Sequence, residues 1–229
     1  MTVRKFWNWK NSADGGERVL TFDGPIADES WYGDEITPKA FKDELESGKG
    51  PVTVWLNSPG GDCFAASQIY SMLTEYSDTV TVKIDGLAAS AASVVAMAGD
   101  VVMMAPTAMM MIHNPSMWAW GDHADMQKAI DVLNEAKESI LNAYELKTGL
   151  SRTKLSHMME DETWMNARKA LELGFIDRLT TDKETGNAYA YASASTIKAI
   201  TNKLAEKPQN TGAKVSDLRA RLYESLLTF

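Results

Sequence analysis

Apolar and polar positions along the chain alternate between two periods, one typical of strands and one typical of helices. The period-two and β-branched runs predict strands at residues 18–22, 52–56, 79–84, 101–105 and 109–113. The three-to-four-residue period predicts helices at residues 37–45, 62–76 and 90–98. Thr37 and Pro38 suit the first helix start, and Gly99 is expected as the left-handed stop of the third. This βαβ order predicts an α/β fold.

A different pattern begins near residue 125, where one long amphipathic helix is predicted to run to residue 147. Its apolar stripe comprises Met126, Ile130, Leu133, Ile140, Leu141 and Tyr144. Such a stripe has to pack on its own domain or on another subunit, and the pattern leaves both open. A short helical pair follows at residues 151–159 and 167–173, the second ending at Gly174.

Composition changes along the chain predict four parts. They are an N-terminal segment (1–17), a folded domain (18–180), a flexible linker or extension (181–212) and a C-terminal amphipathic helix (213–229). Polar and small residues without a core-forming period mark the linker. The last part repeats leucine or valine every three or four residues, so we expect it to dock on the body or on a partner.

Charge and cysteine content narrow the function classes. With 31 acidic against 23 basic side chains the net charge is −8, which argues against nucleic acid or an anionic membrane as the main partner. The only cysteine, Cys63, excludes an internal disulfide and fits a reducing compartment; its place just inside a predicted helix suits a small packed side chain better than a nucleophile. No apolar run approaches the ~18 residues of a membrane span, and the first residues lack a signal-type core. We expect a cytoplasmic protein.

Three short segments carry the candidate chemistry. They are Asn-Ser-Pro-Gly-Gly at 57–61, Gly-Leu-Ala-Ala-Ser at 86–90 and Met-Ile-His-Asn-Pro at 111–115. The first two follow predicted strands and open predicted helices, and such junctions leave backbone N–H groups free for a ligand. A serine, a histidine and a paired-glycine turn are the parts with which an acyl-transfer enzyme holds a tetrahedral oxyanion.

With these segments in this order, residues 21–179 resemble the ClpP-type serine peptidases. The resemblance implies a ClpP/crotonase-type α/β fold of repeated ββα units with a protruding handle helix, through which subunits assemble into a ring or stacked rings. Residues 4–10 and 162–164 are most similar to the ClpP-related head maturation proteases of tailed phages and prophages. That subtype implies a capsid or scaffold protein as polypeptide substrate in the host cytoplasm. An ATPase partner stays an open question.

Ser90 is the expected nucleophile, because small residues flank it and allow a peptide to approach its Oγ. By itself, a serine at this place could simply cap a helix. Ser93, one turn later, is expected to be a packed polar residue. Ser58 is expected to form the glycine turn with its hydroxyl.

His113 is the expected general base because it ends a strand, where site residues commonly emerge. His123 and His157 have polar neighbours and are expected to be structural or solvated. The three histidines lack the spacing of metal ligands, so neither a metal nor another cofactor is expected.

The third triad member departs from the family pattern, which has an aspartate. Counting back without gaps from Asp177 places Glu162 at that position, with Asp161 as the runner-up. Both acids could also belong to a helix-flanking run that is merely solvated.

The resemblance assigns the oxyanion hole to the backbone N–H groups of Gly61 and Ala91. A side chain at Gly61 is expected to crowd the scissile carbonyl. Crotonase-like acyl-CoA enzymes use the same two-amide arrangement, so they are the nearest enzymatic alternative, although the chain lacks a basic cluster for a nucleotide phosphate.

The function that best fits these features is a serine endopeptidase, a hydrolase that processes capsid or scaffold protein during phage head maturation. A catalytically idle assembly or scaffold protein with the same fold is the alternative from another class. A serine–lysine relative of signal peptide peptidases is disfavoured by the well-placed His113.

Overall fold

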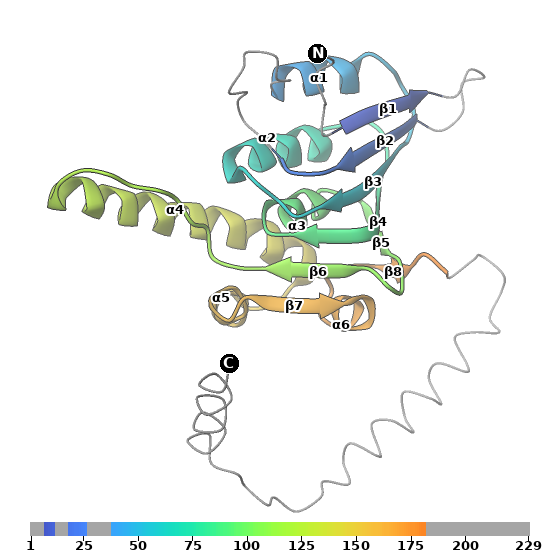
Figure 1. Cartoon of the computed structure of the whole chain (residues 1–229). Helices are drawn as coiled ribbons and strands as arrows, with labels where there is room; N and C mark the ends of the chain where they lie inside the picture. Colours follow the sequence, from blue (N-terminus) through green and yellow to red (C-terminus); the bar gives the residue numbers. More distant parts are fainter. Residues whose placement is uncertain (1–6, 12–17, 27–37, 182–229) are drawn as a thin grey trace, which may run out of the picture. The chain divides into compact units, whose positions relative to one another are not determined.

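The computed structural model describes residues 7–11, 18–26 and 38–181 (Figure 1). Its strands are β1 (Trp7–Asn11), β2 (Arg18–Asp23), β3 (Val52–Ser58), β4 (Val80–Ala89), β5 (Val101–Met104), β6 (Met109–Ile112), β7 (Thr163–Asn166) and β8 (Arg178–Leu179). Its helices are α1 (Pro38–Glu46), α2 (Cys63–Thr74), α3 (Ala91–Ala96), α4 (His123–Thr148), α5 (Arg152–Glu160) and α6 (Ala167–Glu172).

One mixed sheet organises these elements, in the strand order β1-β2-β3-β4-β5-β8. Strands β2 to β5 and β8 are parallel, and β1 is antiparallel to β2. The long strand β4 changes neighbour along its length: its first half pairs with β5 and its last residues, Leu87 to Ala89, pair with β6. Strand β7 then adds to β6 in the antiparallel sense. The carboxyl end of β4 therefore lies beside β6, and the chain turns there directly into α3.

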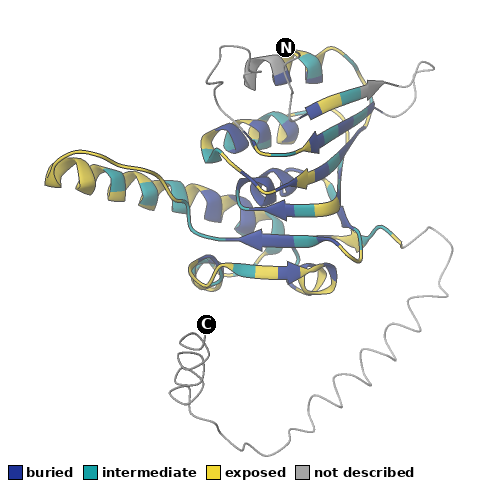
Figure 2. Ribbon diagram, viewed as in Figure 1, coloured by how far each residue is buried: buried dark blue, intermediate teal, exposed yellow. Residues whose placement is uncertain are grey.

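The core lies between the sheet and its helices, and all six helices of the described residues contribute buried residues to it (Figure 2). Alternate residues of β2 are buried, as expected for a strand with one covered face. All six residues of α3 are buried, which explains why this helix contains only small and β-branched residues and Ser93.

Helix α4 projects from the body at one end (Figures 1 and 2). Its C-terminal half buries Ile140, Leu141, Ala143 and Tyr144, whereas Met126 and Ile130 near its start are exposed. Asp122 caps its N-terminus in a capping box, and Gly149, at φ 66°, ends it in the left-handed conformation that glycine adopts without strain. The predicted stripe is thus covered by the body only in its second half.

Most predicted elements are present, with three differences. Strand β4 runs five residues further than the predicted strand, to Ala89, because β6 offers it a second partner. Strands β1, β7 and β8 are additional. The prediction for Gly99 is wrong: its φ is not positive, and it is needed because a Cβ there would lie 2.9 Å from Val82 Cγ2.

The predicted linker (181–212) and C-terminal helix (213–229) lie outside the described residues apart from residue 181, and so does most of the predicted N-terminal segment. Thr37, the predicted N-cap of α1, is also outside them. Within the described ranges, no helix is long and apolar enough to cross a membrane.

Candidate active site

Ser90 occupies the sharp turn between β4 and α3. Its backbone has φ 54° and ψ −127°, a positive φ that non-glycine residues rarely adopt. Its N–H donates to the carbonyl of Met111 on β6 at 2.9 Å, which continues the pairing of Ala89 with Met111. The strand pair therefore holds the serine backbone in a strained conformation at the point where its side chain leaves the sheet.

His113 directly follows β6 and contacts this serine. Its Nε2 lies 2.7 Å from Ser90 Oγ, well within hydrogen-bonding distance. The next residue, Asn114, donates its N–H to the carbonyl of Met159 on α5. The backbone on both sides of the imidazole is thus tied to a neighbouring element, and the sequence-predicted nucleophile and base are brought together.

The paired-glycine turn lies against the serine. A Cβ added at Gly60 would be 2.7 Å from Ser90 Cβ and 2.9 Å from Ala91 N. Ser58, which is buried, accepts the N–H of Gly60 through its Oγ at 3.1 Å and so forms the turn as predicted. The turn therefore packs directly on the junction between Ser90 and Ala91.

The surroundings of Gly61 differ from the prediction that a side chain there would crowd the scissile carbonyl. Ile26 donates to the carbonyl of Gly60 and accepts from the N–H of Asp62, which is the pattern of a parallel bridge to Gly61. In such a bridge the N–H of Gly61 itself points away from Ile26. A Cβ at Gly61 would lie only 2.0 Å from Ile26 O. The glycine is therefore required by the neighbouring backbone, and Gly60 is the glycine that packs on the nucleophile.

The acidic candidates lie just before β7, the strand that pairs with β6, but within the described residues they are not hydrogen-bonded to the histidine. Strand register pairs Ile112 with Thr163, and one further step places Glu162 opposite His113. Glu162 has φ 46°, and its carboxylate accepts the indole N–H of Trp164 at 3.2 Å. Asp161 is the C-cap of α5 and donates its N–H to His157.

Among the described residues, the side chains of the predicted nucleophile and base form no hydrogen bond with the other serine, cysteine and histidine candidates. Ser93 is fully buried on α3, as predicted for a packed polar residue. Burial raises the pKa of the Cys63 thiol and so disfavours a reactive thiolate. His123 and His157 are exposed on α4 and α5. Among the described residues no group of three or more potential metal ligands is present.

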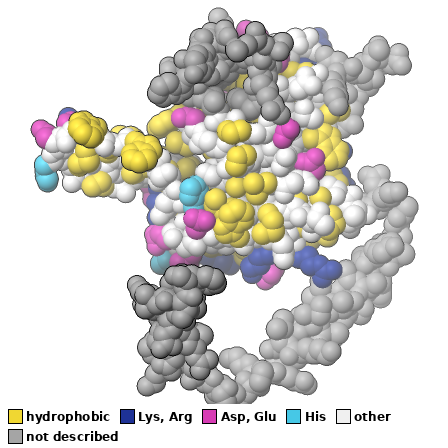
Figure 3. Space-filling model, viewed as in Figure 1, with side chains coloured by type: hydrophobic (Ala, Val, Ile, Leu, Met, Phe, Trp, Pro, Cys, Tyr) yellow, Lys and Arg dark blue, Asp and Glu magenta, His cyan; other side chains and the backbone are white. Residues whose placement is uncertain are grey.

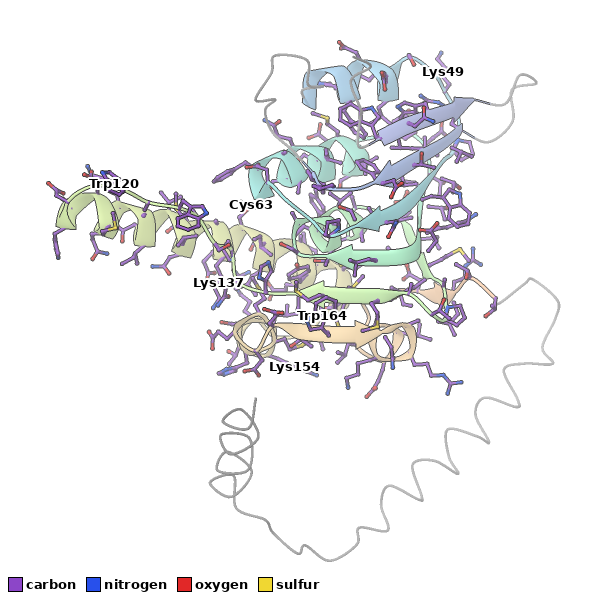
Figure 4. The ribbon with its side chains drawn as sticks, viewed as in Figure 1. Lys49, Cys63, Trp120, Lys137, Lys154 and Trp164 are labelled. Atoms are coloured by element: carbon purple, nitrogen blue, oxygen red, sulfur yellow. The ribbon has the colours of Figure 1, made fainter. Side chains whose placement is uncertain are left out.

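The sequence pattern predicts no separate role for Tyr144 or Trp164, although Tyr144 contacts Ser93 and Trp164 binds the carboxylate of Glu162. In the sequence Tyr144 is one member of an apolar stripe, and its hydroxyl is the only signal there of a polar partner. Figure 4 shows Trp164 on β7, beside β6, and half of its surface is exposed.

A matched pair of glycine substitutions tests the contact between the turn and the serine. Gly60→Ala should lower activity toward any substrate of this site about a hundredfold, because its methyl group would displace Ser90 or Ala91. Gly50 has nearly the same φ, 95° against 96°, but a Cβ there meets nothing within 4 Å. Gly50→Ala should therefore cost only the backbone strain of about 1–2 kcal/mol in the free energy of unfolding and leave turnover unchanged. Equal activities of the two variants would contradict the contact.

Comparison with known proteins adds the family context. A model of the Clp protease family matches residues 16–183. The "ATP-dependent Clp protease proteolytic subunit 1" of Chlamydia muridarum is 30% identical over 164 residues, which cover 70% of this chain and 84% of that protein. The proteins with the same description from Chlamydia trachomatis serovar D and Chlamydia abortus are each 29% identical over the same shares. The matched region contains both Ser90 and His113.

Proposed function

Because the chain belongs to the Clp protease family, we propose that it is a serine endopeptidase of the ClpP type, with Ser90 as nucleophile and His113 as general base. The fold class predicted from the sequence is the α/β fold of this family. The observation that supports the two roles best is the 2.7 Å contact between Ser90 Oγ and His113 Nε2. A serine hydroxyl is a weak nucleophile near neutral pH and requires such a base.

The geometry suits acyl transfer to water in two steps. Ser90 Oγ attacks the scissile carbonyl carbon while His113 Nε2 takes the hydroxyl proton, and the carbonyl electrons move to oxygen. When the C–N bond breaks, the same proton passes to the leaving amine. Water then attacks the ester with His113 again as base, which releases the acid and restores the serine. No external oxidant, reductant or cofactor is required.

The N–H groups of Gly61 and Ala91 are proposed as the oxyanion donors. Ala91 begins α3, so its N–H has no acceptor within the helix. The bridge to Ile26 leaves the N–H of Gly61 on the opposite side, and the glycine turn packs on Ser90. Each such donor typically contributes about 3 kcal/mol to transition-state stabilisation.

We assign the third position to Glu162, with Asp161 as the alternative. The register that places Glu162 opposite His113 favours it. Its hydrogen bond to Trp164 means that the carboxylate has to leave the indole N–H, or share it, to orient the imidazole. The same bond is the observation that favours the idle assembly protein as second candidate function.

A fluorophosphonate probe distinguishes these two functions. Wild-type protein should be labelled at Ser90, as located by peptide mass spectrometry, and Ser90→Ala should not be labelled. A folded wild-type protein that resists labelling would favour the idle assembly protein.

The projecting end of α4 is proposed as a contact between subunits in a ring or stacked rings. Trp118 and Trp120 are 100% and 98% exposed in the segment before α4, and Figures 3 and 4 show large hydrophobic side chains on this arm. Exposed apolar groups of this size indicate an interaction surface.

Native mass measurement tests this surface. Wild-type protein should form an assembly many times the 25.2 kDa chain mass, and Trp118→Ser with Trp120→Ser should shift it to smaller species. Phe64→Ser is the control, because Phe64 is also exposed but lies on α2. An unchanged mass in the double variant would contradict the role of the arm.

The proposed substrate is a capsid or scaffold protein of a tailed phage or prophage, cleaved in the host cytoplasm. This proposal depends on the similarity of residues 4–10 and of the Glu162-Thr163-Trp164 segment to head maturation proteases; in that segment Glu162 and Trp164 are both exposed. Co-expression with the neighbouring structural genes should give Ser90-dependent cleavage of one of their products. Cleavage without any ATPase would agree with this role.

A further inference from the structure

A buried chain of hydroxyl groups joins the backbone of Ser90 to α4. Ser93 Oγ lies 2.5 Å from the carbonyl oxygen of Ser90, and Tyr144 Oη lies 2.8 Å from Ser93 Oγ. Ser93 is 0% and Tyr144 1% exposed. A carbonyl only accepts, so Ser93 has to donate its single proton to it, and Tyr144 has to donate to Ser93. The direction of both hydrogen bonds is therefore fixed.

These hydroxyls lie where apolar groups would suffice for packing. The other five residues of α3 are alanine and valine, and the ring of Tyr144 packs edge-on against Phe175 with centroids 5.6 Å apart. Alanine and phenylalanine would fill the same space without buried polar atoms, and paired apolar replacements of this kind are often nearly neutral for stability. We therefore expect these two hydroxyls to have a function in addition to packing.

The carbonyl that they hold belongs to the peptide between Ser90 and Ala91. A trans peptide is planar, so its C=O and N–H point in opposite directions. The backbone N–H of Ser93 binds the same carbonyl at 2.9 Å, which gives it two donors from one residue. Fixing the carbonyl on the interior side directs the Ala91 N–H outward, toward the turn of Gly60 and Gly61.

We propose that Ser93 and Tyr144 are positioning residues that hold the Ser90–Ala91 peptide with its N–H aimed at the oxyanion. The proposal rests on the serine peptidase function proposed above. It also accounts for the positive φ of Ser90, because the two donors on its carbonyl oppose relaxation of the strained turn. Burial raises the pKa of Tyr144, so its hydroxyl stays protonated and able to donate across the neutral range.

Conservative variants test this role by steady-state kinetics on a peptide substrate. Ser93→Ala should lower kcat about tenfold to a hundredfold with KM changed less than twofold, because a misdirected donor loses part of the 10²–10³ that one oxyanion donor supplies. Tyr144→Phe should lower kcat less. The double variant should resemble Ser93→Ala, because the two hydroxyls act in series.

Two further readouts separate positioning from a merely structural effect. The affinity of a peptide aldehyde, whose tetrahedral adduct places an oxygen in the same hole, should fall in parallel with kcat/KM. The pH profile should keep its shape, because His113 is untouched. Matched controls are Tyr76→Phe, which removes a tyrosine hydroxyl bonded to Gly50 O, and Ser67→Ala, which removes a serine hydroxyl bonded to Cys63 O. Both should keep the wild-type kcat.

The outcomes are distinguishable. An active wild-type enzyme with normal kcat and aldehyde affinity in both Ser93→Ala and Tyr144→Phe would overturn this inference alone. A wild-type protein with neither hydrolysis nor probe labelling would overturn the proposed function and this inference with it. If Ser93→Ala fails to fold, the kcat and aldehyde affinity of Tyr144→Phe test the positioning role alone. This variant removes one oxygen and keeps the ring that packs on Phe175.

Discussion

Replacing Ser90 with alanine should lower peptide hydrolysis by about 10⁶-fold, the loss seen when a triad nucleophile is removed. The remaining catalysis would come from substrate binding and the oxyanion donors. Structural effects should be small, because the backbone N–H of Ser90 keeps its bond to Met111 and the only side-chain bond lost is that to His113, about 1 kcal/mol in the free energy of unfolding. Turnover of a peptide substrate and thermal unfolding measure the two effects separately.

Ser71→Ala is the matched control, because this serine is exposed on α2 and its hydroxyl binds a backbone carbonyl of the same helix. It should behave as wild type in both measurements. Normal turnover in Ser90→Ala would remove the nucleophile assignment and, with it, the role of the contact to His113. A large loss of stability in Ser90→Ala would instead show that the strained turn depends on the hydroxyl.

The parts of the fold that the sequence predicted well are those whose local pattern agrees with their final environment. The strand at 52–56 is almost fully buried and the strand at 18–22 has one covered face, and the apolar residues of each run show this directly. Strand β7 has four residues and exists because β6 offers it a free edge, a partner some fifty positions away. Strand β1 alternates tryptophan with polar residues and is covered through Trp7, which packs on Phe41 of α1. Neither condition is visible in a short window of sequence.

In the site, too, some residues could be predicted from local sequence and others depend on distant partners. Ser90 and His113 were predicted from motifs, and the structure brings their side chains together because β4 and β6 are neighbours. The roles of Ser93 and Tyr144 depend on a contact between two helices that are 51 residues apart at this point. The orientation of Glu162 depends on Trp164, two residues later. Side-chain partners of this kind are set by tertiary packing, so motif and period alone could not predict them.

The acidic position should have the second largest effect. If Glu162 orients His113, Glu162→Gln should lower turnover by about 10⁴-fold, because an amide can favour the wrong imidazole tautomer. Asp161→Asn should be mild, since Asp161 lies one step further from the register position opposite His113. Turnover of the same peptide substrate, with probe labelling at Ser90 as a second readout, measures both variants.

Two further variants test how the carboxylate is held. Glu162→Asp restores the family's residue type on a backbone that has φ 46°, and its activity should lie between those of wild type and Glu162→Gln. Trp164→Phe removes the indole N–H but keeps an aromatic ring, so it releases the carboxylate toward His113 and should not lower turnover. A dead Asp161→Asn beside a healthy Glu162→Gln would shift the acidic position by one residue. Near-normal activity in both would mean that Ser90 and His113 act as a dyad, with water or a backbone carbonyl supporting the imidazole.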